Sequence, residues 1–189
     1  RFLYNLSLRG LGVLNYQNDY LTGEKIWLKK YLKDKSDAVI IDVGANVGNY
    51  SKMILSVNQG AKILAFEPHP ITFKKLISNI NSANFQAFNL GVSNSKGNLK
   101  LYDYQSNVGS SHASIYIDVI KDLHKKQAIS HEVDIIALDD FLTKKNIFEV
   151  DLLKIDTEGN EYNVLVGLKS FIAERKIKSI HFEFNEMNI

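Results

Sequence analysis

Residues 39–51 read Val39-Ile40-Ile41-Asp42-Val43-Gly44-Ala45-Asn46-Val47-Gly48-Asn49-Tyr50-Ser51. The segment begins with an apolar run rich in β-branched residues, passes through a turn with two glycines, and then takes up helical spacing. It therefore predicts a strand, a loop and a helix. Glycine lets a ligand approach the backbone closely, and the start of a helix offers free N–H groups. These residues alone indicate either a nucleotide-binding loop or an ordinary strand-to-helix turn.

The rest of the chain repeats this alternation of strands and helices. We expect further strands over residues 62–68, 85–92, 131–136, 150–156 and 177–184, and helices over 22–35, 47–58, 71–82, 138–146 and 161–174. A turn at 94–98 and a hairpin arm at 99–102 interrupt the pattern. The sequence therefore predicts an α/β fold: a Rossmann-like, doubly wound, mostly parallel sheet with helices on both faces. We expect one domain, residues 37–189, with an N-terminal arm and helix, residues 1–36, packed on its core.

The composition narrows the class of protein. The 189 residues carry 23 Lys or Arg and 21 Asp or Glu, a net charge of +2, so we expect neither a nucleic-acid nor an anionic-membrane partner. The absence of cysteine excludes a cysteine nucleophile and fits a reducing compartment, so we expect a cytoplasmic protein. No apolar run reaches the roughly 20 residues that span a bilayer, and the opening segment resembles a domain start rather than a signal peptide. A small or weakly charged partner fits this balance best.

Acidic residues gather where the predicted strands end. In open α/β sheets the ligand lies beyond the carboxyl ends of the strands, near the point where the strand order reverses. The residues at those ends are Asp42, Glu67, Asn89 to Gly91, Asp156 and Glu183, so four of the five places carry a carboxylate. Glu67 is placed to accept hydrogen bonds from ribose hydroxyls, as acids in NAD-binding folds also do. We therefore expect a ligand site at this edge of the sheet.

Candidates for catalysis lie near the last two strands. Asp156 and Glu158 follow one predicted strand, and His181 and Glu183 share one face of the next because side chains alternate along a strand. A histidine paired with a carboxylate can act as a general base. Other interpretations stay open: Glu158 caps the next helix, His181 is an interior histidine, or the four residues hold a divalent metal, although we expect none. The remaining histidines, His69, His124 and His131, are expected at the surface, and His112 lies in an unpatterned loop, 105–114, that is expected to gate the substrate.

The spacing of the glycines separates two kinds of nucleotide-binding loop. Gly48 lies four positions after Gly44, and Asp42 precedes both, which departs from the Gly-x-Gly-x-x-Gly pattern of dinucleotide-binding folds. Together with two other segments, this loop resembles the class I S-adenosylmethionine-dependent methyltransferases, and more narrowly the FkbM family. The three segments are Ile41-Asp42-Val43-Gly44-Ala45-Asn46-Val47-Gly48, Phe66-Glu67-Pro68 and Leu153-Lys154-Ile155-Asp156-Thr157-Glu158-Gly159-Asn160-Glu161. The last segment is the most specific, and the resemblance covers about residues 24–183.

The resemblance implies S-adenosylmethionine as the cofactor and O-methylation of a small-molecule or carbohydrate hydroxyl. It implies that Gly44, Asn46 and Gly48 surround the methionine part, Glu67 the ribose, and Asn89 to Gly91 the adenine, with Asp156 near the amino group or the transferred methyl. The full expected set is Glu24, Asp42, Gly44, Ala45, Asn46, Gly48, Asn49, Tyr50, Glu67, Pro68, Asn89, Leu90, Gly91 and Asp156. The family fold adds a final strand hairpin, which we expect to be missing because the chain stops at Ile189. Two other functions stay open, a non-catalytic scaffold domain and an NAD-dependent oxidoreductase.

Overall fold

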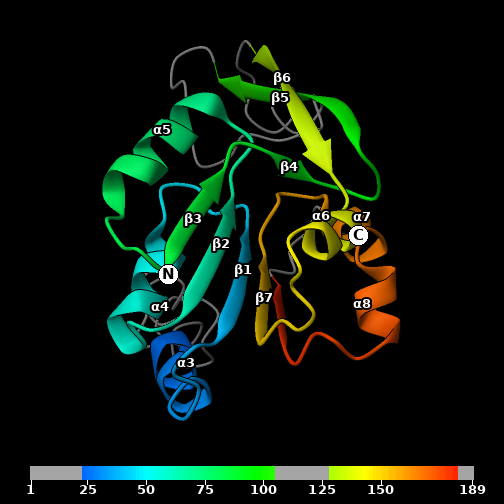
Figure 1. The fold of residues 1–189 in the computed structure, drawn as a ribbon. Helices are drawn as coiled ribbons and strands as arrows, with labels where there is room; N and C mark the ends of the chain where they lie inside the picture. Colours follow the sequence, from blue (N-terminus) through cyan, green and yellow to red (C-terminus); the bar gives the residue numbers. More distant parts are fainter. Residues whose placement is uncertain (1–22, 105–127, 183–189) are drawn as a thin grey trace, which may run out of the picture.

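The computed structural model describes residues 23–104 and 128–182, which form an α/β fold around a five-stranded sheet (Figure 1). The strands of this sheet lie in the order β3-β2-β1-β7-β8, and all the neighbouring pairs are parallel. Their bounds are β1 Val39–Val43, β2 Lys62–Phe66, β3 Phe85–Phe88, β7 Leu152–Ile155 and β8 Ile180–Phe182. The order reverses between β1 and β7, where a ligand site is expected in such a sheet. The predicted Rossmann-like sheet is confirmed, and β1 has the predicted bounds.

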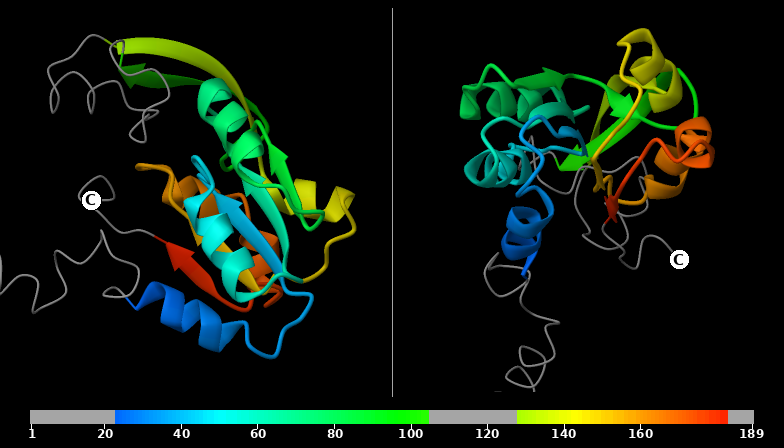
Figure 2. Two further views of the ribbon diagram at one scale, coloured as in Figure 1. Left: turned by 90° about the vertical axis from the view of Figure 1, so that its left-hand side faces the viewer. Right: turned by 60° about the horizontal axis from the view of Figure 1, so that its bottom comes forward.

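Helices cover both faces of the sheet, as predicted (Figures 1 and 2). One face carries α3 Glu24–Tyr31, α4 Asn49–Val57 and α5 Pro70–Asn79, and the other carries α6 Leu138–Lys144, α7 Glu161–Val166 and α8 Lys169–Ala173. The alternation within β1 accounts for the two layers. Ile40 is buried among residues of α3 and α4, whereas Ile41 is buried among residues of α6, α7 and α8. Apart from Asp42 the strand is apolar, because both of its faces are covered.

A second, three-stranded sheet lies beyond the parallel one. Its strands are β4 Gly91–Val92, β5 Gly97–Tyr104 and β6 Ala128–Ile136, in the order β4-β6-β5. β5 and β6 form an antiparallel arm, longer than the predicted hairpin, that projects from the molecule near α5 (Figure 2). The prediction of one strand over 85–92 is wrong because the chain changes sheets at Asn89. The Asn89 amide donates to the carbonyl oxygens of Glu67 at 2.9 Å and Pro68 at 2.8 Å, and this holds the crossing point.

The prediction of one helix over 161–174 is also wrong, because α7 and α8 are separate helices. Asp139 of α6 explains the break. Its backbone N–H donates to the carbonyl oxygen of Gly167 at 2.9 Å. Its carboxylate accepts from the backbone N–H groups of Ser170 at 2.8 Å and Phe171 at 3.1 Å, which lie in the first turn of α8. A side chain from another helix therefore satisfies the free N–H groups that begin α8.

Several predictions concern the ends of the elements. The helix predicted over 22–35 is the shorter α3, preceded by Gly23 with a φ of 75°. The N-terminal arm, the loop at 105–114 with His112, and also His124 and Glu183, lie outside the described residues. Within the part that the structure describes, no helix is long and apolar enough to cross a membrane.

Candidate active site

The loop after β1 packs directly against the end of β7. Gly44 has a φ of 75°, and a Cβ atom there would lie 1.6 Å from the carbonyl oxygen of Asp156. Only glycine fits both this conformation and this space. Asn46 also has a positive φ, 50°, and Gly48, with a φ of 89°, immediately precedes α4. The sequence thus forms a tightly wound loop that places its backbone at the carboxyl edge of the sheet.

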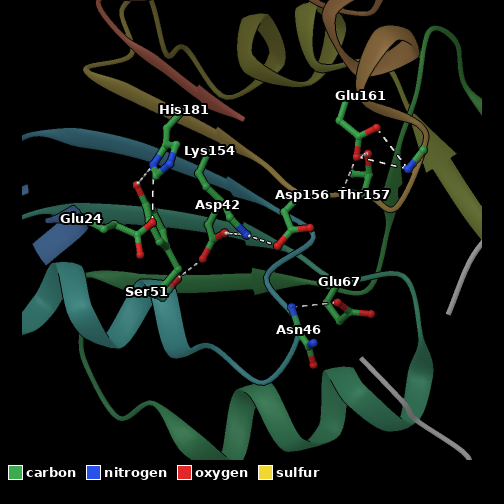
Figure 3. Close-up of polar contacts among 12 residues, drawn as sticks. Glu24, Asp42, Asn46, Ser51, Glu67, Lys154, Asp156, Thr157, Glu161 and His181 are labelled. Atoms are coloured by element: carbon green, nitrogen blue, oxygen red, sulfur yellow. Dashed lines mark hydrogen bonds and ion pairs between the residues drawn. The ribbon is translucent and has the colours of Figure 1, made fainter. Parts of the chain in front are cut away.

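Glu67 follows β2 and faces this loop (Figure 3). Its side chain accepts hydrogen bonds from the backbone N–H groups of Asn46 at 2.9 Å and His69 at 2.8 Å. Burial, with 7% of the residue exposed, raises the pKa of Glu67 to about 7, although both N–H donors act to lower it. A carboxylate oxygen that accepts one hydrogen bond can accept another. Glu67 can therefore bind further donors at this edge.

The prediction that His69 and His131 lie at the surface is wrong. His69 is buried, and its Nδ1 accepts from the backbone N–H groups of Ile71 at 3.3 Å and Thr72 at 3.4 Å, so it caps α5. Its ring lies edge-to-face on that of the half-buried His131 in β6, with 4.7 Å between the ring centres. This contact joins the second sheet to α5. The sequence signal that His69 caps a helix was Pro70 at the first position of α5, because proline is favoured directly after an N-cap residue.

A row of polar residues crosses three neighbouring strands on the face covered by α4 (Figure 3). Lys154 of β7 lies opposite Asp42 of β1 on one side and opposite His181 of β8 on the other. The Lys154 ammonium lies 2.9 Å from the Asp156 carboxylate and 4.0 Å from that of Asp42. Asp42 is fully buried and accepts a hydrogen bond from the Ser51 hydroxyl of α4 at 2.6 Å. The row thus links the interior of the sheet to its carboxyl edge.

Burial and neighbouring charges act in opposite directions on the pKa values of Asp42 and Lys154. Burial raises the pKa of Asp42, although the Lys154 charge and the Ser51 hydroxyl oppose it. Burial acts to lower the pKa of Lys154, but the carboxylates of Asp42 and Asp156 outweigh it, so this pKa is raised and the ammonium keeps its charge. Our sequence reasoning missed Lys154 as a site residue. The available signal was its place, together with Asp42, within strands that are otherwise apolar.

His181 is held by residues of α3 and α4. Its Nδ1 lies 3.0 Å from the Tyr50 hydroxyl and 3.7 Å from a carboxylate oxygen of Glu24, and Trp27 contacts its ring edge-to-face. Burial lowers the pKa of His181, and the charge of Lys154 lowers it further, while burial raises that of Tyr50. The ring is therefore neutral at neutral pH, beside a protonated phenol. A carboxylate beside His181 is thus that of Glu24, and the predicted pairing with Glu183 lies outside the described residues.

The turn after β7 is fixed by a residue that we did not predict. Glu161, the first residue of α7, accepts from the backbone N–H groups of Thr157 at 2.8 Å and Gly159 at 3.1 Å, and from the Thr157 hydroxyl at 2.9 Å (Figure 3). The carboxylate of Glu161 thus satisfies backbone N–H groups of this turn. Glu158 itself has a φ of 54°. The available signal was an acidic residue in the first turn of a helix.

Two pockets meet at this edge of the sheet. The first is lined by Glu67, Pro68 and Glu158 and by apolar residues that include Leu90, Gly91, Leu101, Val133 and Ile135. The second is lined by Glu24, Trp27, Ala45, Asn49, Tyr50, Lys154, His181 and Phe182. Gly44, Asn46 and Asp156 line both pockets. Glu67, predicted for the ribose, and Leu90 and Gly91, predicted for the adenine, thus lie in the first pocket, and His181 lies in the second.

Three residues expected to bind the cofactor do not line these two pockets. Asp42 and Gly48 are buried within the fold, and Asn89 is exposed and bonded to the backbone that follows β2. As for the metal alternative, no three or more His, Cys, Asp or Glu residues of the described segments form a group that could hold a metal ion.

The strand order, the glycine loop and the acid after β2 define an α/β protein of the Rossmann-like class. Comparison with known families is more specific: this chain belongs to the family of the methyltransferase FkbM domain, which it matches over residues 42–188. A crystal structure of methyltransferase FkbM from Methylobacillus flagellatus has the same fold, with a TM-score of 0.50 and 17% identity over 85% of this chain and 40% of that one.

Several curated methyltransferases are similar in sequence. Methyltransferase 1 of Beauveria bassiana is 34% identical over 146 residues, which cover 70% of this chain and 59% of that protein. The 2-O-methyltransferase NoeI of Sinorhizobium fredii is 24% identical over 84% of this chain and 68% of its own length. The hexuronic acid methyltransferase AglP of Haloferax volcanii is 26% identical over 89% of this chain and 64% of its own length. The match thus spans about two thirds or less of each relative.

Proposed function

We propose that this chain is the S-adenosylmethionine-binding domain of an O-methyltransferase that acts on a hydroxyl group of a small molecule or a sugar. The observation that carries the proposal is that two pockets share Gly44, Asn46 and Asp156, one with a buried carboxylate suited to a ribose and the other with a neutral histidine. Residues 37–189 would form this domain, with α3 of the preceding segment packed on it.

The residues of the first pocket suit the nucleoside part of this cofactor. Both oxygens of Glu67 accept one backbone N–H group each, and both can accept another donor, which matches two neighbouring ribose hydroxyls. Leu90, Leu101 and Ile135 offer an apolar wall for adenine. Pro68 and Gly91 would complete this side, and Asn89 would act only by fixing the backbone of Glu67 and Pro68.

The carboxylates between the pockets suit the charged end of the cofactor. Asp156 and Glu24 supply negative charge for an ammonium group and a sulfonium, and the loop backbone from Gly44 to Gly48 would surround the methionine part, with Ala45 and Asn49 beside it. When bound, S-adenosylmethionine would supply an activated methyl group. Asp42 is buried and would not touch the cofactor; it would contribute by holding the Lys154 ammonium.

His181 would take the proton of the acceptor hydroxyl. A neutral imidazole with its proton on Nδ1 can donate toward Glu24 or the Tyr50 oxygen, and its Nε2 can then accept a proton. Asp156 and Glu158 would orient the acceptor, because alignment supplies much of the rate of a displacement reaction. Glu183, predicted as a further carboxylate of the site, stays a prediction.

The second pocket and the relatives support a polyhydroxylated acceptor. Trp27, Tyr50 and Phe182 present aromatic surfaces there, against which the apolar side of a sugar ring or a polyketide can pack. NoeI is a 2-O-methyltransferase and AglP a hexuronic acid methyltransferase. Membership of a methyltransferase family favours S-adenosylmethionine over NAD as the cofactor of this chain.

Calorimetric titration of the full-length protein with S-adenosylhomocysteine tests the proposal. We expect one molecule to bind per chain and NADH not to bind. Glu67→Ala should weaken binding, whereas Lys62→Ala, at the opposite end of β2, should not. A folded protein that does not bind S-adenosylhomocysteine would refute the proposal. Transfer of a labelled methyl group to a panel of sugars and polyketides then separates an enzyme from a scaffold domain, which would bind the cofactor without transfer.

A further inference from the structure

Lysine is an unusual residue inside a buried parallel strand. β7 consists of Leu152, Leu153, Lys154 and Ile155, and the other three residues are fully buried. Only 13% of the Lys154 side chain is exposed. Burying an unpaired charge is strongly unfavourable, so partners must hold it. Those partners are carboxylates on both sides of its ammonium, Asp156 at 2.9 Å and Asp42 at 4.0 Å.

The two carboxylates lie at different depths. Asp42 is fully buried; its Oδ2 accepts from Ser51, while its Oδ1 has no hydrogen-bond partner and faces Lys154. Asp156 lines both pockets. The ring of Tyr50 lies under the same ammonium, 5.4 Å from Nζ to the ring centre. Figure 3 shows the Lys154 ammonium between the carboxylates of Asp42 and Asp156. Asp42 and the Tyr50 ring therefore hold the ammonium on the buried side, and Asp156 contacts it at the pockets.

We infer that Lys154 is a positioning residue: its ammonium holds the Asp156 carboxylate where the two pockets meet and lies next to His181 on the neighbouring strand. This role rests on the proposed methyl transfer, because Asp156 and His181 are the groups that this reaction would use. The buried ammonium of Lys154 would thus orient the Asp156 carboxylate and place a positive charge beside His181, the proposed base.

The charges around His181 support this role. Among the residues that the structure describes, the ionisable groups that face its ring are Glu24 from α3, Tyr50 from α4, Lys154 from β7 and Asp156 after it. Lys154 is the cation among them, and its charge lowers the pKa of His181, whereas the charge of Asp156 raises it. Lys154 does not itself act as a base, because its own pKa is raised and it stays protonated.

The test is the pKa of His181, measured by NMR titration of the histidine rings in the cofactor-free protein. The chain has five histidines, and the His181 signal is identified by its loss in His181→Gln. Lys154→Met removes the charge and keeps most of the length of the side chain. We expect it to raise the pKa of His181 by about one pH unit, the effect of one charge on a neighbouring strand at an effective dielectric constant of about 20. Lys154→Arg keeps the charge and should keep the wild-type value.

Two further variants separate charge from folding. Lys154→Met leaves the buried Asp42 without its cation and can prevent folding. In that case the double variant, Asp42→Asn with Lys154→Met, is measured in its place. The double variant should raise the pKa of His181 by the same amount, and Asp42→Asn alone should leave it unchanged. An unchanged pKa in a folded protein without Lys154, or an equal rise in Asp42→Asn, would overturn the inference.

Cofactor binding gives a second, separate measurement. Lys154→Met should weaken binding of S-adenosylhomocysteine about tenfold or more, because Asp156 loses its fixed orientation, and Lys154→Arg should restore most of the affinity. Equal affinity in Lys154→Met and the wild type would contradict the positioning of Asp156. Absence of binding in the wild type would instead refute the proposed function, while the titration of His181 would still decide the effect of Lys154 on the histidine.

Discussion

Replacement of Glu67 by glutamine is expected to change how the stability of the protein depends on pH. The Glu67 carboxyl is buried and receives backbone N–H groups from Asn46 and His69. Its pKa rises on folding from an ordinary value of 4.5 to about 7 because burial disfavours the charged form. Between these two values the folded protein binds more protons than the unfolded one, so its stability falls as the pH rises.

The size of this effect follows from the pKa values. A rise from 4.5 to about 7, at about 1.4 kcal/mol for each pKa unit, corresponds to about 3 kcal/mol. This stability is fully present below about pH 4.5 and is lost once the pH has risen through about 7. The Glu67→Gln variant has no ionisable group at this position, so it does not lose this stability as the pH rises. The difference in unfolding free energy between the two proteins should therefore change by about 3 kcal/mol in favour of the variant as the pH rises.

Urea unfolding followed by circular dichroism, from about pH 4.5 to pH 8 and without cofactor, measures this difference. Other buried ionisable groups, such as Asp42, are present in both proteins and largely cancel. Glu149→Gln, which removes an exposed carboxylate, should give a curve parallel to that of the wild type. Parallel curves for Glu67→Gln and the wild type would refute the argument, because they would mean that Glu67 ionises near its ordinary pKa.

Three further predictions concern the loop after β1, the turn after β7 and the base. Gly44→Ala should lower the unfolding free energy by about 2–4 kcal/mol and abolish binding of S-adenosylhomocysteine, because the added Cβ meets the Asp156 carbonyl oxygen. The control is Gly23→Ala, which has the same φ but open space around the added Cβ and should cost only about 1 kcal/mol. Equal losses of stability in urea unfolding would contradict the steric explanation. Glu161→Ala should cost about 2–3 kcal/mol in the same assay, because the half-buried N–H groups of Thr157 and Gly159 lose their acceptor. The exposed Glu174→Ala should be near neutral, and a small effect at Glu161 would show that water replaces the carboxylate. His181→Gln should lower the rate of methyl transfer about 10²–10⁴-fold with little change in cofactor affinity. In the wild type this rate should rise with pH through the pKa of His181, which lies below the ordinary 6.5, and the variant should lack that rise. An unchanged rate would exclude His181 as the base.

The parallel core could be predicted because its signal is local. β1 and β2 are short, mostly apolar runs followed by Gly44 and Glu67, so their existence follows from composition and punctuation. The predicted bounds are those of β1, whereas β2 ends at Phe66, two residues before the predicted end. The position of Glu67 at the edge of the sheet follows in turn from the rule for parallel strands. The glycine loop could be predicted for the same reason.

The errors arise where a side chain from a distant segment replaces a backbone partner. Asn89 ends β3 by bonding to carbonyl groups after β2, and Asp139 divides the last helical region by capping α8. His69 is buried because its ring caps α5 and packs on the second sheet. Periodicity carries no information on such contacts, because each depends on which segments meet in space. The pairing of His181 with Glu24 required the position of α3, which the sequence pattern alone does not place.

The packing of Gly44 on the carbonyl of Asp156 has a consequence for attempts to redesign the acceptor specificity of this domain. The two pockets share this contact, so a substitution that moves the end of β7 to reshape the second pocket, the proposed acceptor site, also displaces the loop that lines the first pocket, the proposed nucleoside site. Trp27 on α3 and Phe182 on β8 line the second pocket and not the first. Libraries confined to those positions should alter the choice of acceptor while leaving affinity for the methyl donor intact.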